Sequence, residues 1–345
     1  MTWLPERGTL IQSTHRIAFL GLCLCTTSPV DAEQGDDAAM LQLRSQHALG
    51  AVFGLPGVAQ RPVQSYEWQL SLEHSNQFMG GTAGEETLFL DGETTELTFH
   101  YRQRLAPCWQ GDLALPFIQH GAGLFDRAID DWHQFFGMPD AGRDAFAFGE
   151  FTYSYRDEDG NGVTIDQPQS GFGNIRLSVQ RSLECQATAD SNASESIARL
   201  GLKLPTGSLS EFRGSGSPDL YADIQSPVWS SGARWRAGAT VGVMLTGRGS
   251  RLPPQRALVG FGTVGVQYRL THRYRLIAQV DWHTPFFHSR LRELGDATFV
   301  LSTGLRYLAR HDQTLELSIS EDAAIDTAPD IVARLAWIYR PTPGQ

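Results

Sequence analysis

Apolar and polar residues alternate with a period of two along most of this chain, from about residue 66 onwards. In the last such segment Leu335, Trp337 and Tyr339 share one parity, whereas Arg334 has the other. Successive side chains of a β-strand point to opposite faces, so this alternation predicts strands with one apolar and one polar face. The segments are roughly ten to thirteen residues long, which is the length that a tilted strand needs to cross a bilayer.

About twelve segments of this kind follow one another, and an even number is typical of bacterial outer-membrane barrels. They lie near residues 66–78, 92–104, 109–118, 171–183, 195–205, 219–229, 233–246, 257–270, 273–284, 297–309, 313–321 and 329–340. The predicted fold class is all-β: a single antiparallel transmembrane β-barrel of about 12 strands, with a long extracellular loop that carries a short helix. A soluble β-sandwich or lipocalin-like barrel is the alternative, but its strands would average about five or six residues.

The lengths of the connections orient the barrel, because periplasmic turns are short and outer loops are long. The longer connections are expected near 79–91, 206–218, 247–256, 285–296 and 321–328. Both termini then lie in the periplasm. Residues 119–170 are expected to form one long outer excursion, with a helix near 124–136 and a hairpin closed at 157–162.

The N-terminus has the features of a secretory signal peptide. Arg7 and Arg16 precede an apolar stretch at 17–25, which is too short to span a membrane, and small residues for cleavage follow. We therefore expect export to the outer membrane of a Gram-negative cell. The expected organisation is a cleaved signal at 1–32, a flexible lumenal or periplasmic segment at 33–62 and the barrel at 63–340.

The composition agrees with a barrel and limits the classes of partner that the protein is expected to bind. Of the 345 residues 41% are hydrophobic, and no apolar run long enough for a membrane helix, about 18 residues, follows residue 30. The formal net charge of −10 and the lack of a basic stripe disfavour nucleic-acid binding. Outer-membrane lipid and a small-molecule cargo are the expected partners. The sequence identifies neither the cargo nor the oligomeric state.

Charged residues on the polar faces are predicted to line the interior. The candidate lumen or ligand residues are Arg176, Arg199, Lys203, Arg234, Arg236, Arg275, Asp281 and His283. One interpretation is a polar conduit whose arginine-rich wall selects anions. The other is a filled, salt-bridged interior that only stabilises the barrel. Because a barrel of about twelve strands can leave a narrow channel, we predict a passive channel or small-molecule binder.

Two alternatives stay open, an outer-membrane lipid hydrolase and a structural or assembly barrel without transport. A hydrolase would pair His283 with Asp281 or a nearby lumen acid, or place His74 or His100 against Ser71 or Ser75. No Gly-x-Ser-x-Gly motif is present, so no catalytic residue is assigned and enzyme activity is not the favoured prediction.

Two loop clusters are candidates for ligand or metal binding. Asp126, Asp130 and His133 would share one face of the predicted outer helix, where they either bind a ligand or are solvated acids of an amphipathic helix. A second run, Asp157, Asp159 and Asn161, matches the start of an EF-hand calcium loop. Pro168 stands where that loop needs its bidentate Glu, and a plain hairpin tip is the simpler interpretation. The sequence predicts no cofactor, with calcium at the 157–161 run as the alternative.

Two of the four cysteines, Cys108 and Cys185, lie after the predicted signal and at periplasmic strand ends. Since the envelope is oxidising, a disulfide between them is chemically permitted. Its geometry cannot be judged from the sequence, because strand neighbours are not known.

Several short motifs resemble those of known families. They include Phe53-Gly54-Leu55-Pro56, Asp91-Gly92-Glu93, the run from Leu124 to His133, Phe136-Gly137-Met138-Pro139, Gly171-Phe172-Gly173-Asn174 and Leu202-Lys203-Leu204-Pro205-Thr206-Gly207. In this order, over about residues 45–340, the chain resembles an uncharacterised proteobacterial envelope family, the domain of unknown function 3187. It is more loosely similar to outer-membrane barrels linked to aromatic-compound degradation, although Asn174 stands where their pattern has Asp. The resemblance implies a barrel and supplies no catalytic residues.

Overall fold

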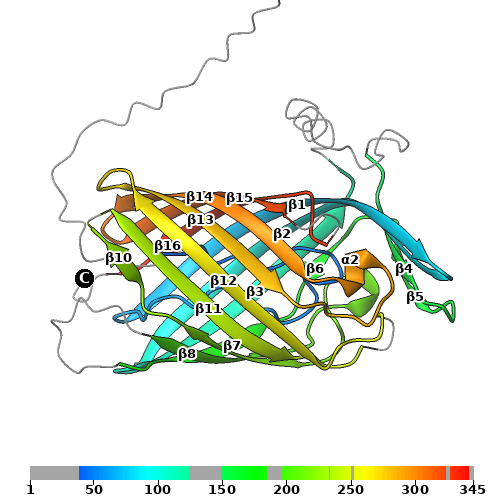
Figure 1. Ribbon diagram of the computed structural model, residues 1–345, viewed down its shortest axis with the longest axis horizontal. Coiled ribbons are helices and arrows are strands. Elements are labelled where there is room, and N and C mark those ends of the chain that lie inside the picture. Colours follow the sequence, from blue (N-terminus) through cyan, green and yellow to red (C-terminus); the bar gives the residue numbers. More distant parts are fainter. Residues whose placement is uncertain are drawn as a thin grey trace, which may run out of the picture. The chain divides into compact units, whose positions relative to one another are not determined.

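The computed structural model describes residues 39–123, 149–184, 196–232, 234–249, 252–323 and 327–341, all within one compact unit. Their strands form a single sheet of 16 strands, and four of these (β4, β5, β6 and β10) lie outside a closed ring. The remaining twelve form an antiparallel barrel (Figure 1). The ring contains β1 (Tyr66–Ala83), β2 (Glu86–Ala106), β3 (Trp109–Gly121), β7 (Arg176–Ser182), β8 (Ile197–Lys203), β9 (Asp219–Gln225), β11 (Trp235–Leu245), β12 (Leu258–Arg269), β13 (Tyr274–His283), β14 (Thr298–Arg310), β15 (Gln313–Asp322) and β16 (Ile331–Tyr339).

The ring closes because the last strand pairs with the first, from Trp68↔Tyr339 to Asn76↔Ile331. Each of the twelve predicted crossings falls on one strand of the ring, so the predicted fold class is confirmed. Among the described residues, no helix has the length and apolar character that would be needed to cross a membrane.

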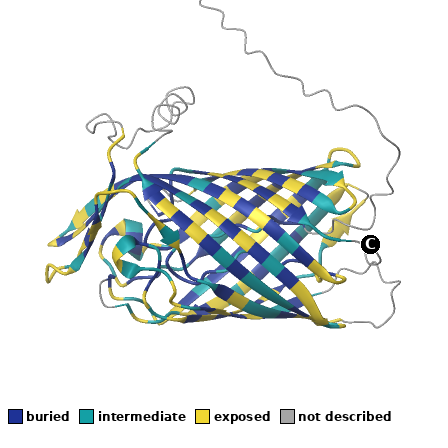
Figure 2. Cartoon of the chain, turned by 180° about the vertical axis from the view of Figure 1, so that it is seen from behind, coloured by how far each residue is buried: buried dark blue, intermediate teal, exposed yellow. Residues whose placement is uncertain are grey.

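Exposed and buried residues alternate along the wall (Figure 2). Many of the exposed residues are apolar, and many of the buried ones are polar. Leu200 and Leu317 on the outer face are 49% and 54% exposed, whereas Arg306 and Arg334 on the inner face are each 2% exposed. A soluble protein has the reverse distribution. Aromatic pairs such as Trp68–Trp337 and Trp235–Tyr268, each with centroids 4.6 Å apart, lie at the strand ends where interfacial girdles are expected.

Short turns join the strands at one end of the barrel, here called the turn end, and longer connections at the other, the loop end. The connection predicted at 79–91 is an exception. β1 and β2 continue through it to a tight turn at Gly84, whose φ is +68°. The predicted long connection is wrong, because the two strands pair from Met79↔Leu90 to Ala83↔Glu86. In fact the alternation continues, and Met79 and Leu90 are buried.

Short strands and one-turn helices lie in the connections at the loop end. A hairpin of β4 (Thr152–Arg156) and β5 (Gly162–Ile165) pairs with the outer end of β2, and β6 (Gln169–Phe172) pairs with β3. The hairpin closes where the sequence predicted. The 3-10 helix η2 (Leu209–Glu211) and the one-turn helix α2 (Arg292–Gly295) lie in later connections at this end. At the turn end, β10 (Trp229–Ser231) pairs with the first residues of β11. The helix predicted at 124–136 lies outside the described residues.

Candidate functional site

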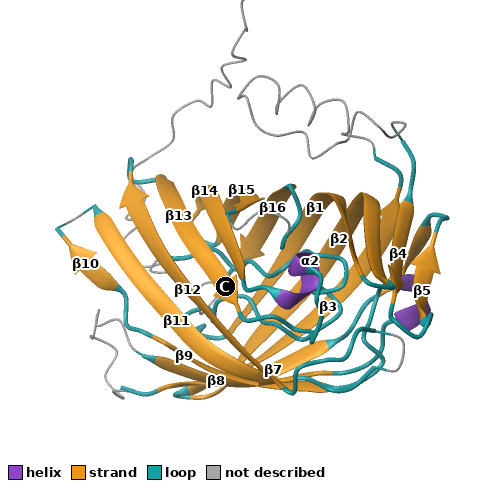
Figure 3. Cartoon of the chain, turned by 45° about the vertical axis from the view of Figure 1, so that its right-hand side comes forward, coloured by secondary structure: helices purple, strands orange, loops and turns teal. Residues whose placement is uncertain are grey.

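The barrel interior is occupied by residues 39–63 of the chain itself, here called the plug (Figures 1 and 3). Leu41 contacts Gln279 on β13, Gly54 is hydrogen-bonded to Asp219 where β9 begins at the loop end, and Val63 contacts Gln110 near the turn end. The plug therefore rises from the turn end to the loop end and returns before β1 begins.

Side-chain amides of the wall bind the plug backbone. Gln279 accepts from the Leu41 N–H at 2.7 Å and donates to the Leu41 carbonyl at 3.2 Å. Gln77 likewise accepts from the Ala48 N–H at 2.8 Å and donates to the carbonyl of Gln46 at 3.1 Å. An irregular buried segment needs such partners, because its own backbone groups are unpaired. These glutamines were not among the predicted lumen residues, and in the sequence only their inward parity indicates them.

Inward-facing glycines form the seat of the plug's first residues. An ideal Cβ on Gly265 would lie 2.6 Å from Cγ of Met40, and one on Gly304 would lie 2.8 Å from Cδ1 of Leu41. A Cβ on Gly238 would lie 3.0 Å from Cε of Met40. Any larger side chain at Gly265 or Gly304 would therefore need the plug to shift. The barrel wall and the plug have complementary shapes.

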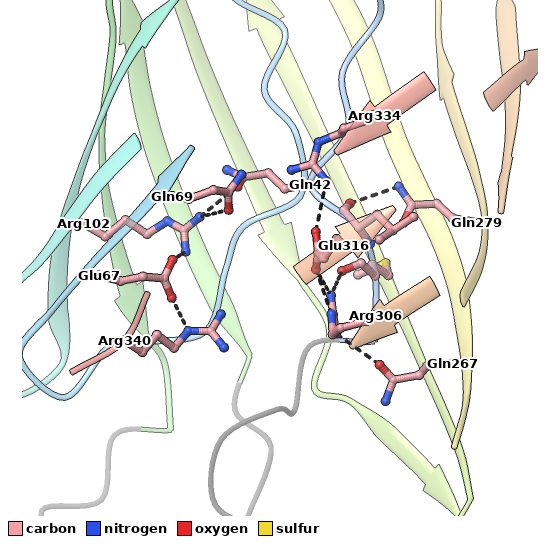
Figure 4. Close-up of polar contacts among 12 residues, drawn as sticks. Gln42, Glu67, Gln69, Arg102, Gln267, Gln279, Arg306, Glu316, Arg334 and Arg340 are labelled. Atoms are coloured by element: carbon pink, nitrogen blue, oxygen red, sulfur yellow. Dashed lines mark hydrogen bonds and ion pairs between the residues drawn. The ribbon is translucent and has the colours of Figure 1, made fainter. Parts of the chain in front are cut away.

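A ladder of alternating charges crosses four neighbouring strands inside the barrel, and Figure 4 shows its part on β14, β15 and β16. Arg306 on β14 bonds Glu316 on β15 at 2.7 Å, and Glu316 accepts from Arg334 on β16 at 3.0 Å. Arg334 in turn lies 3.3 Å from Glu73 on β1. Elsewhere Arg102 pairs with Glu67, and Arg44 of the plug pairs with Glu96. These arginines face carboxylates rather than an open lumen.

Most predicted lumen residues also lie inside the wall. Arg176 is 3.9 Å from Glu96, Arg199 is 2.9 Å from Asp223, and Lys203 is 2.9 Å from Asp219. The buried Arg275 donates to the carbonyl of Thr271 at the turn end, and Arg236 is half-buried. The placement of Arg234 in the lumen was wrong. It precedes the first ladder pair of β11, is exposed, and donates to the Tyr268 hydroxyl at 3.0 Å. A ligand role for these residues stays a prediction.

Asp281 and His283 do not form the pair that a hydrolase would need. Asp281 accepts from the Thr263 hydroxyl at 2.6 Å and from the Gln279 amide. His283 has Nδ1 2.9 Å from the Thr284 carbonyl, and its ring lies 4.5 Å from that of Phe286.

The carboxylate of Asp157 closes the β4–β5 hairpin. It accepts from the backbone N–H groups of Asp159 at 3.0 Å and Asn161 at 2.7 Å, as in the hairpin-tip interpretation. In the described part of the chain, no group of three or more His, Cys, Asp or Glu residues is placed to hold a metal ion.

Other candidate residues fall partly or wholly outside the described ranges. Asp126, Asp130 and His133 are among them, so their role stays a prediction. Cys108 is disulfide-bonded. Because Cys185 also lies outside the described residues, a Cys108–Cys185 bridge remains a prediction.

His47 gives the docked plug a dependence on pH. The side chain is buried, and Nδ1 accepts from the N–H groups of Leu49 and Gly50 at 3.2 and 3.3 Å. Burial, followed by the nearby His283, lowers the pKa of His47 to about 4, from an ordinary value of 6.5. The docked plug therefore binds a proton less readily than a solvated plug does.

The docked plug should consequently loosen in acid. The contribution of His47 is complete above about pH 6.5 and is lost as the pH falls to about 4, where the loss is about 3 kcal/mol. Protease cleavage of the plug, measured from pH 7 to pH 4, should accelerate across this window. His47→Asn, which removes the titration, should flatten the profile. Equal acid sensitivity in both proteins would refute the assignment to His47.

The wall is a closed antiparallel ring with an apolar exterior and a polar interior. These features define a transmembrane β-barrel of the outer-membrane type. The chain belongs to DUF3187, a family described as "Protein of unknown function", whose model matches residues 19–340.

Solved structures with a similar fold are outer-membrane barrels. The COG4313 outer membrane channel from Pseudomonas putida F1 aligns with a TM-score of 0.53 and 12% identity, over 81% of this chain and 96% of that chain. The NanC porin aligns at 0.44 and 7%, over 79% and 100%. The P. putida toluene transporter TodX aligns at 0.40 and 9%, over 81% and 91%. At such identities the likeness concerns the fold. No protein with a curated description matches the sequence.

Proposed function

We propose that this protein is a passive outer-membrane channel for small molecules, closed by its own plug, and that conduction requires the plug to move. The observation that carries the proposal is what fills the interior. A barrel with a purely structural interior needs only the side chains of its wall. Here a separate segment, residues 39–63, occupies the lumen. It is held by hydrogen bonds to wall side chains and by apolar packing, in which Leu49 and Phe53 lie in one cluster with residues of the wall and loops.

The ion pairs within the wall and the hydrogen bonds between plug and wall support a movable plug. Wall charges are largely satisfied within the wall, as in the Arg306–Glu316–Arg334 ladder, so the wall does not depend on the plug for most of its charge pairing. Each plug–wall hydrogen bond contributes a net of about 0.5–1.5 kcal/mol, which is small enough to be broken. A displaced plug would leave a polar, hydrated passage.

A disulfide between the plug and the wall tests this proposal. An ideal Cβ on Gly238 lies 3.6 Å from Cβ of Ala39, within the usual Cβ–Cβ range for a disulfide of about 3.5–4.5 Å. The pair Ala39→Cys and Gly238→Cys in the full chain should conduct in planar bilayers when reduced and stay closed when oxidised. Each single substitution should be insensitive to redox conditions. Equal conductance of the oxidised and reduced double variant would contradict a moving plug.

A further inference from the structure

A cavity whose lining combines apolar surface with several polar groups remains between the plug and the wall, in the half of the barrel nearer the loop end. Its volume is about 50 Å³. It is lined by plug residues 43–46, 55 and 56, by residues 328 and 329, and by residues of β1, β12, β13, β14, β15 and β16. On the scale of about 10–15 Å³ for each water-sized probe, this space accommodates about four non-hydrogen atoms.

Within the described ranges, four lining side chains have a buried polar atom that makes no hydrogen bond to another described residue. These atoms are Nε of Arg44, Oγ of Ser45, Nε2 of His283 and Nη2 of Arg334. Each of the four residues is at least nine-tenths buried. Such atoms are costly unless something occupies the cavity and bonds them.

Whether each of these atoms donates or accepts a hydrogen bond determines which chemical groups an occupant must carry. The two guanidinium N–H groups can only donate, and the Ser45 hydroxyl can donate or accept. The Thr284 carbonyl can only accept, so Nδ1 of His283 carries the ring proton and Nε2 of the neutral ring accepts. The occupant must therefore offer oxygen acceptors to Arg44 and Arg334 and an N–H or O–H group to His283.

The charge of the lining favours an uncharged occupant. Arg44 and Arg334 contribute two positive charges, and Glu73 and Asp281 contribute two negative charges, so the formal sum is zero. The carboxylates already have donors, Arg334 and Gln46 for Glu73, and Thr263 and Gln279 for Asp281. An anion would gain no net attraction from this lining.

We infer that the cavity is a binding site for a small uncharged polar solute that carries both a hydrogen-bond acceptor and a donor, such as a primary amide or an alcohol. This rests on the proposed channel function for its role as a station on the transport route. The binding itself can be measured without conduction.

Saturation-transfer NMR on the purified full-length barrel tests the site, with acetamide as the probe and acetate as its isostere of equal size. Acetamide should bind saturably, and acetate should bind about tenfold or more weakly, because it is charged and has no donor for His283. Arg44→Lys keeps a charge beside Glu96 but lacks the Nε–H donor, and it should weaken acetamide binding about fivefold to tenfold. Ser45→Ala, which leaves the ion pair intact, provides a second variant.

The failures of the two proposals are distinguishable. Acetamide binding without conduction would support the binding site and contradict the proposed channel function. Conduction without saturable acetamide binding overturns the site and leaves the channel. Tighter binding of acetate, unchanged binding in both variants, or a crystal soaked in acetamide that shows only water in the cavity would each overturn the assignment.

Discussion

Glu316→Ala is expected to lower the free energy of unfolding of the barrel by about 3–5 kcal/mol, the cost of removing one member of a buried ion-pair network. Its two carboxylate oxygens bond Arg306 at 2.7 Å and Arg334 at 3.0 Å, and each arginine is only 2% exposed. Without Glu316 both guanidinium charges stay buried with one carboxylate fewer. On the wall, Arg306 and Arg334 would then no longer be separated by a negative charge on β15.

Urea unfolding of the refolded barrel, followed by tryptophan fluorescence, measures this effect. Glu158→Ala is the matched control, since Glu158 forms a 3.0 Å ion pair with Arg290 but both side chains are more than half exposed. That pair should contribute less than about 1 kcal/mol. Equal losses for the two variants would show that Glu316 is hydrated rather than buried in a network.

Deleting residues 42–60 is expected to convert a barrel that conducts only while its plug is displaced into one that conducts ions continuously. The deletion removes most plug–wall hydrogen bonds and takes Phe53 out of its stack with Phe286, where the centroids are 4.8 Å apart at the loop end. The ring should survive, because β16 still pairs with β1 and Arg102 still pairs with Glu67. Glu96 loses Arg44 but keeps Arg176 within 3.9 Å.

Planar-bilayer recordings of the deletion variant and the full chain measure the difference. A shift of apparent size on unheated gels verifies that the variant is folded before recording. A folded deletion variant that stays silent would show that the rest of the chain also blocks the lumen, and plug movement would then not be sufficient for conduction.

The wall was predictable from the sequence because lipid imposes a period of two on every crossing. Leu317 and Leu335 face outwards and Arg334 faces inwards, as parity requires. Parity fails at particular positions: Asn76 and Phe78 are buried despite their outward parity, and a strand end gives another exception. Arg234 lies one residue before β11 begins, and there a side chain of inward parity is solvated at the rim.

The plug and its partners were not predictable in the same way. An irregular segment has no period, so nothing in residues 39–63 indicates which wall side chains meet its backbone. Gln279 and Gln77 are ordinary inward polar residues until the fold brings Leu41 and Ala48 to them. Ion-pair partners such as Arg306 and Glu316 depend on strand register, which sequence alternation leaves undetermined.

Hydrogen–deuterium exchange of the full-length barrel in lipid vesicles tests the docked plug most directly. The N–H groups of Leu41, Ala48, Gly54 and Val63 donate to wall side chains at 2.7–2.8 Å, so peptides that cover residues 40–63 should exchange slowly at neutral pH. Exchange should accelerate when Gly265→Val displaces Met40. Complete exchange of these peptides at the rate of an unstructured chain, in the unmodified protein, would contradict a plug that fills the lumen.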